Sequence, residues 1–158
     1  MQILNFSGVV IASYYLMSIL QAVLHRTHGH RNRIRSVFEA HAIRHHGQYP
    51  AHKLQTMKFI ELEGHALWYY GIPVVAFASV TFLSFGLVTT IALLLGVLIT
   101  VAWNVYLHRQ YHLLESPFDR FAWFEKKRRL HFIHHRDARV NFAVVEFWID
   151  SLMGTRRD

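Results

Sequence analysis

The stretch AWNVYLHRQYH, residues 102–112, joins the longest apolar run of the chain to a pair of histidines. This run covers residues 66–107, and none of its 42 residues is Lys, Arg, Asp or Glu. One membrane-crossing helix needs about 20 apolar residues, so a run of this length predicts two crossings. The sequence SFG at 84–86 is a suitable turn between them. We therefore expect crossings at about 66–84 and 87–107.

A second apolar segment lies at the start of the chain, where residues 1–24 carry no charged side chain. Residues 6–24 would form a helix of about 28 Å, just long enough to cross the hydrocarbon core. No basic residue precedes this segment. It is therefore expected to be a retained anchor rather than a cleavable signal.

The basic residues define an orientation. All 17 Lys and Arg lie in 25–65 or 108–158, so the net charge of +7 belongs to two segments and not to the whole surface. This pattern favours a membrane protein over a nucleic-acid partner, and the positive-inside rule places both segments in the cytoplasm and the N-terminus outside. We predict an all-α integral membrane protein, a single domain over 1–158 with three crossings and a cytoplasmic helical cap. Within the cap, helices are expected over 31–46, from Ser116 onward and over 143–153.

Histidine is unusually frequent, with 13 in 158 residues. Ten of them form four groups in the two basic segments: His25 and His30; His41, His45 and His46; His108 and His112; His131, His134 and His135. Side chains three or four positions apart share one face of a helix, so most members of a group can point the same way. Ten imidazoles exceed the needs of one ion and predict two, and imidazole suits iron, zinc, copper and nickel. His28, His52 and His65 are expected to be surface or packed residues.

Other metal chemistries do not fit the sequence. The chain has no Cys, which excludes thiolate and iron–sulfur sites and disulfides. Neither Glu-x-x-His nor His-Glu-x-x-His occurs, so carboxylate-bridged di-iron bundles and zincins do not apply. A metal transporter would need ionisable residues inside the crossings, and 6–24 and 66–107 contain none. What remains is an all-histidine, two-metal site at a membrane surface.

The four histidine groups and the C-terminal tail resemble those of a known family. The stretches LHRTHGH, HAIRHH, HRQYH and HFIHH resemble the histidine boxes of the fatty acid hydroxylase / sterol desaturase superfamily, which are integral membrane di-iron enzymes. The tail HHRDARVNFAVVEFWIDSLMGT resembles the family's run of histidine pair, Asn-aromatic-Gly, Trp-Asp and Gly-Thr. The resemblance covers about 20–156. Two features depart from it: Ala143 stands where the family often has glycine, and three crossings are predicted where the family usually has four.

The resemblance implies a catalytic metal site of two iron ions, with zinc able to replace iron in a purified sample. Its ligands would be His25, His30, His41, His45, His46, His108, His112, His131, His134 and His135. Behind these ligands, carboxylates and an amide would orient the rings. The candidates are Asp150, Glu146, Asn141 and Glu39.

The activity that the resemblance implies is O2-dependent hydroxylation of a membrane lipid acyl chain or a related lipid. We expect no electron-transfer domain in this chain, so electrons would come from a separate protein such as cytochrome b5, or ferredoxin with its reductase. A desaturase, a sterol- or carotenoid-type oxygenase and a non-catalytic metal-binding membrane protein remain alternatives. Three crossings are also compatible with a homo-oligomer.

Overall fold

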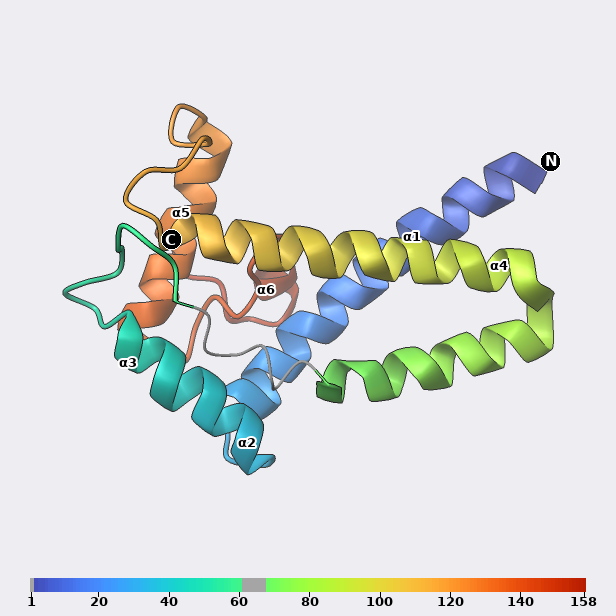
Figure 1. Cartoon of the computed structure of the whole chain (residues 1–158), viewed down its shortest axis with the longest axis horizontal. Helices are drawn as coiled ribbons and strands as arrows, with labels where there is room; N and C mark the ends of the chain where they lie inside the picture. Colours follow the sequence, from blue (N-terminus) through green and yellow to red (C-terminus); the bar gives the residue numbers. More distant parts are fainter. Residues whose placement is uncertain (1, 61–67) are drawn as a thin grey trace.

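Two long apolar helices dominate the fold. The computed structural model describes residues 2–60 and 68–158, and the regular elements in this part are helices. Helices α1 (Gln2–Leu24) and α4 (Trp68–Tyr111) extend away from a group of shorter elements at one end of the molecule, as Figure 1 shows. Within α4, Gly86 has φ 78° and ψ −175°, and the chain reverses its direction there. This reversal lies in the turn predicted at 84–86. Glycine can adopt the positive φ that the reversal needs, because it has no Cβ.

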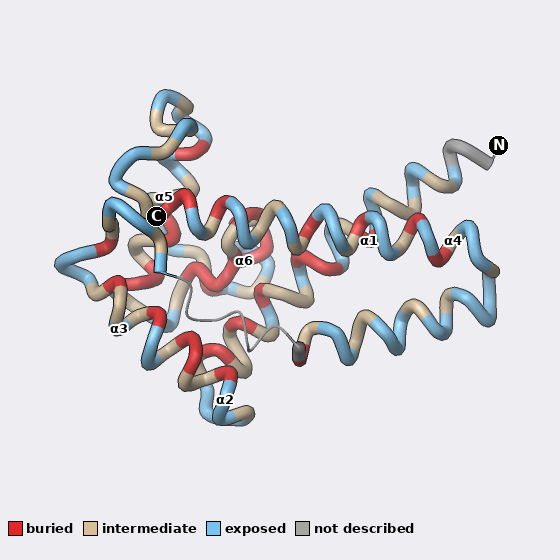
Figure 2. The backbone as a smooth tube through the Cα atoms, in the orientation of Figure 1, coloured by how far each residue is buried: buried red, intermediate tan, exposed pale blue. Residues whose placement is uncertain are grey.

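Both long helices meet the requirements of membrane spans. Asn5–Gly29 and Tyr69–Tyr111 are long and apolar enough to cross, yet only 22% and 17% of their most apolar windows are buried inside the protein. The core helix of a soluble protein would be mostly buried. Figure 2 shows the same contrast, with buried residues concentrated at the end that carries the short elements and exposed ones along the arms of α4. Residues 61–67, which include His65 and the first two residues of the predicted 66–84 crossing, lie outside the described residues.

The shorter elements form a cap at one end of the two long helices. After α1 come the π-helix η1 (His25–Gly29) and a continuous helical segment made of α2 (Arg35–Phe38), η2 (Glu39–His45) and α3 (His46–Gln48). Helices α5 (Ala122–Arg136) and α6 (Trp148–Leu152) follow α4. A buried cluster of Ala22, Leu130, Ala143, Phe147 and Ile149 joins α1, α5 and α6. The cap is therefore packed onto the ends of the long helices.

The three helices predicted in the cap are shorter in the structure than the sequence suggests. A helix was expected from Ser116 onward, but α5 begins at Ala122, because the Asp119 carboxylate accepts the Ser116 N–H and closes a separate turn. A helix was also expected over 143–153, but only α6 forms. The N–H groups just before α6, on Phe142 and Ala143, are bound by the Asp150 carboxylate at 2.7 and 2.9 Å. The predicted helix at 31–46 begins at Arg35 and is largely a π-helix.

Helices α1 and α4 approach each other closely at Gly96. A Cβ placed on Gly96 would lie 2.4 Å from the carbonyl oxygen of Val10 and 2.8 Å from the Cβ of Ser13. One turn further on, the Thr100 hydroxyl donates to the carbonyl of Tyr14 at 3.1 Å. Small residues at such a crossing let two backbones approach, which is how helices associate in lipid.

This contact gives a first prediction. Gly96→Ala is expected to lower the free energy of unfolding by about 1–3 kcal/mol, because the new methyl group meets backbone that cannot rotate away. Gly8→Ala is the control on α1, since a Cβ there meets nothing within 4 Å. Thermal denaturation in detergent measures both. Equal melting temperatures for the two variants would contradict the close helix contact.

Candidate metal centre

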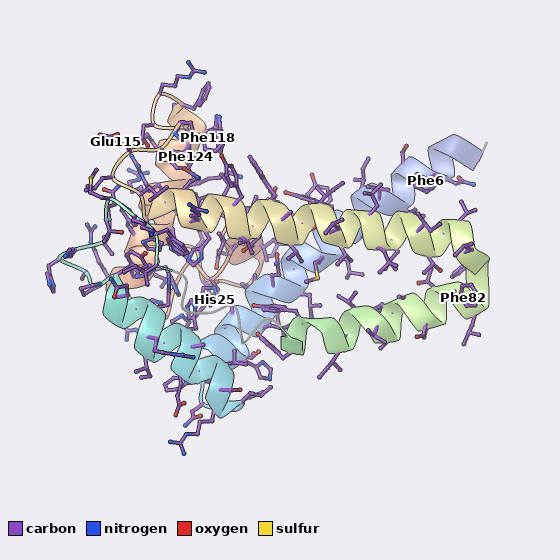
Figure 3. The ribbon with its side chains drawn as sticks, viewed as in Figure 1. Phe6, His25, Phe82, Glu115, Phe118 and Phe124 are labelled. Atoms are coloured by element: carbon purple, nitrogen blue, oxygen red, sulfur yellow. The ribbon has the colours of Figure 1, made fainter. Side chains whose placement is uncertain are left out.

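The histidine rings gather at the cap end of the long helices. Figure 3 labels His25 there, while Phe6 and Phe82 lie toward the opposite end. Ligand atoms of nine histidines form two groups, in each of which all atoms lie within 4.8 Å of one another. The four-histidine group is His25, His30, His41 and His134. The five-histidine group is His45, His108, His112, His131 and His135.

His46, the tenth predicted ligand, lies between the two groups. Its Nε2 is 3.2 Å from the Nε2 of His41, in the four-histidine group. Its ring stacks on His135, in the five-histidine group, with centroids 4.2 Å apart and planes 18° apart. The structure therefore brings all ten predicted residues into one cluster of rings with two centres.

The π-helices decide which ring joins which group. In η1 and η2 the turns are wider than in an α-helix, and residues five apart stand over one another. The Nε2 atoms of His25 and His30 are accordingly 3.2 Å apart, as are those of His41 and His46. His41 and His45, whose i, i+4 spacing predicts that they point the same way, instead belong to different groups.

In the regular helix α5 the expected spacing holds only in part. His131 and His135, four apart, share the five-histidine group, whereas His134 points into the other. Helix α5 therefore supplies ligands to both centres from adjacent positions.

Gly29 leaves space for the rings of the four-histidine group. A Cβ there would lie 3.0 Å from the ring of His25 and 3.3 Å from that of His41.

Backbone carbonyls fix the orientation of four rings. In each, Nδ1 lies 2.5–2.9 Å from a carbonyl oxygen and Nε2 faces the cluster; the pairs are His25 with Phe142, His112 with Leu54, His134 with Val140, and His135 with Tyr49. A carbonyl can only accept, so Nδ1 carries the proton and donates it. The Nε2 lone pair is then free to bind a metal, which is the usual arrangement behind a metal-ligating histidine.

The cluster is buried and its rings are uncharged. Burial lowers the pKa of His46 to about 3 and that of His112 to about 4, and it holds the pKa of His134 well below the usual range. Neutral imidazole is the form that binds metal ions. At neutral pH the protein therefore presents a set of lone pairs rather than a positive patch.

The ring spacing fits metal ions. The Nε2 atoms of His30 and His134 are 3.0 Å apart, as are those of His112 and His131. Two nitrogens bound at about 2.1 Å and at right angles around one ion would be about 3.0 Å apart. His25 and His134 both carry their proton on Nδ1, and the ligand atoms of these two rings lie within 4.8 Å of each other. Two lone pairs therefore face one centre, and a bound cation would satisfy both. The donor set, imidazole without thiolate, suits iron or zinc.

The other predicted site residues stand behind this cluster or away from it. Asp150 is fully buried, and besides the two N–H groups it accepts the Thr155 hydroxyl at 2.7 Å. It therefore acts on the loop whose Phe142 carbonyl holds His25, and not on a ring. Asn141 has φ 53° and ties the same loop to the carbonyls of Leu130 and Arg157.

The two glutamates have other partners. Glu146 accepts hydrogen bonds from the Tyr14 hydroxyl at 2.7 Å and from the Trp148 indole at 3.1 Å. Glu39 pairs with Arg35 on the exposed side of α2. The roles expected of carboxylates are thus filled, for four rings, by backbone carbonyls that a side-chain motif cannot reveal. Of the histidines expected not to be ligands, His28 bonds Thr27 and His52 is exposed.

A cavity of about 300 Å³ adjoins both groups. It lies between α1, α4 and the loop after α5, and its wall includes His25 and His41 from one group and His108 from the other. Most of the remaining wall is apolar, with Met17, Val74, Val101, Val105 and Val144 among its residues. An apolar chain entering between the long helices would reach the histidines through this cavity.

Two apolar helices and a buried cluster of neutral histidines indicate a helical membrane protein whose histidines could bind metal ions. Comparison with known protein families matches residues 10–155 to the fatty acid hydroxylase family, and the chain belongs to that family. Neither the curated proteins nor the solved structures give a match. Family membership and the histidine groups together indicate a metal-dependent lipid oxygenase.

Proposed function

We propose that the protein hydroxylates a membrane lipid, an acyl chain or a related lipid, with O2 at a centre of two iron ions held by the ten histidines. The observation that carries the proposal is the mostly apolar cavity whose wall includes rings of both histidine groups. Such a cavity brings one hydrocarbon segment to both centres at once. A solvent-filled cleft would suit a polar substrate better.

The proposed membrane arrangement has three crossings: α1 and the two arms of α4 on either side of Gly86. The N-terminus would lie outside and the cap in the cytoplasm. Two observations support this: the histidine groups lie at one end of the helices, and all 17 Lys and Arg belong to the segments at that end. The cap is then also the side from which a separate electron-transfer protein would supply electrons.

The bound iron would supply O2 reduction and the oxidation of a C–H bond. The chain's own residues have three tasks: they hold the hydrocarbon, exclude water and orient the histidine rings. The valines and Met17 of the cavity wall hold the hydrocarbon and exclude water. The carbonyls of Phe142, Val140 and Leu54 keep protons on Nδ1, so that the Nε2 atoms stay available.

The experiment is mass spectrometry of host lipids, with and without the expressed protein, under isotope-labelled O2. We expect one heavy oxygen atom per product molecule. A product that has lost two hydrogens without gaining oxygen would instead indicate a desaturase. Unchanged lipids, from a protein that carries its metals and receives electrons from an added reductase, would leave a metal-binding scaffold as the better account.

A further inference from the structure

Two amide side chains interrupt the apolar wall of the cavity. Gln21 on α1 and Asn104 on α4 both line it, and the Asn104 side-chain N–H donates to the Gln21 carbonyl at 3.1 Å. Each residue lies four positions before a clustered histidine, Gln21 before His25 and Asn104 before His108. Four residues correspond to about 6 Å along a helix. The amide pair therefore lies about one helical turn away from a histidine of each group.

The two amides still have unused hydrogen-bond donors and acceptors, whereas Ser18 and Glu146 in the same wall already have partners. The Ser18 hydroxyl donates to the carbonyl of Tyr14, and the two oxygens of Glu146 accept from Tyr14 and Trp148. The amides bond each other once, which leaves one amide N–H₂ and one amide carbonyl. Within 2–60 and 68–158 neither has a further protein partner. Exchanging O and N in both amides still leaves one donor and one acceptor.

We propose that Gln21 and Asn104 bind a hydroxyl group of the lipid substrate, so that the substrate is a hydroxyl-bearing lipid and not a plain hydrocarbon. This inference rests on the proposed function. A hydroxyl is both donor and acceptor and matches the remaining N–H₂ and carbonyl. A carboxylate offers no donor, and an alkane would leave both groups without a partner in an apolar cavity, which is unfavourable. The hydroxyl would then hold the chain with its oxidised carbon a few bonds away.

A purely structural role for the pair makes a different prediction. Polar side chains between membrane helices often serve only as a clamp. Thr100 provides the matched control, because its hydroxyl bonds Tyr14 across the same two helices but does not line the cavity. If the amides were only a clamp, removing either clamp would affect lipid binding in the same way.

The test measures binding, not turnover, so it is independent of whether the enzyme oxidises the lipid. Dissociation constants of hexadecanol and hexadecyl methyl ether are determined by native mass spectrometry on the purified full chain. We expect the wild type to prefer the alcohol about tenfold, the effect of one hydrogen bond. Gln21→Leu and Asn104→Leu are each expected to abolish this preference, and Thr100→Val to keep it.

Equal binding of alcohol and ether by the wild type would overturn the proposal without any variant. It would also be overturned if the leucine variants kept the preference, or if Thr100→Val lost it as they do. A preference that depends on the amides alone, in a protein that yields no oxidised lipid, would support the binding site while the proposed oxygenase activity failed.

Discussion

Replacing His134 or His112 by alanine is expected to remove metal from one centre and to reduce product formation by more than about a hundredfold. His134 belongs to the four-histidine group and His112 to the five-histidine group, and both rings are fully buried. Loss of a residue behind a ligand typically reduces metal affinity or activity by about 10–100-fold, so loss of a ligand should have a larger effect. If oxidation needs both centres, either variant is inactive although the other centre is intact.

Metal content and product yield are measured together for this prediction. The wild type should carry two ions per chain, and each variant about one. His52→Ala is the control, because His52 is exposed and belongs to neither group. It should match the wild type in both measurements. A His134→Ala protein with full metal content or full activity would show that the assigned ligands are wrong.

Asp150→Ala is expected to be the most destabilising substitution outside the histidines. Its carboxylate accepts the N–H groups of Phe142 and Ala143 and the hydroxyl of Thr155, and all of them are buried. A buried donor without a partner costs about 1–3 kcal/mol, so these losses together should lower the free energy of unfolding by about 3–6 kcal/mol. Asp150→Asn should be milder, since one oxygen can still accept.

The milder substitution, Asp150→Asn, is also expected to have a local effect on metal binding. Asp150 holds the loop whose Phe142 carbonyl bonds His25, so Asp150→Asn should weaken metal binding at the four-histidine group by about 10–100-fold and leave the five-histidine group unchanged. Titration of the metal-free protein with ferrous iron measures both sites. Asp137→Asn is the control, because the Asp137 carboxylate bonds the exposed arginines Arg139 and Arg157. Equal weakening of both groups would show that Asp150 acts on overall stability alone.

The large features of this fold could be predicted from the sequence because they depend on composition and on one residue type. Long uncharged runs predict α1 and α4, and the glycine of SFG marks the reversal at Gly86, where φ is 78°. The histidines could be grouped by spacing, but their partition between two centres could not. It depends on η1 and η2 being π-helices. The five-residue separations His25–His30 and His41–His46 were the available signal, and α-helical spacing does not explain them.

The hydrogen bonds that orient the histidine rings could not be predicted from side-chain motifs. Carboxylates were expected to orient the rings, whereas the contacts of His25, His112, His134 and His135 are to backbone carbonyls, which every residue has. Asp150 matters through a peptide group that lies between it and His25. Only the folded loop after α5 makes that connection visible. The amide pair of Gln21 and Asn104 was equally hidden, because its two residues are 83 positions apart.

The most direct test of the account is an experimental density map of the iron-loaded protein in a membrane mimetic. We predict two metal peaks on the cap side. One should lie among His25, His30, His41 and His134, and the other among His45, His108, His112, His131 and His135, with His46 between them. A single peak, or rings of either group separated beyond the reach of one ion, would contradict it.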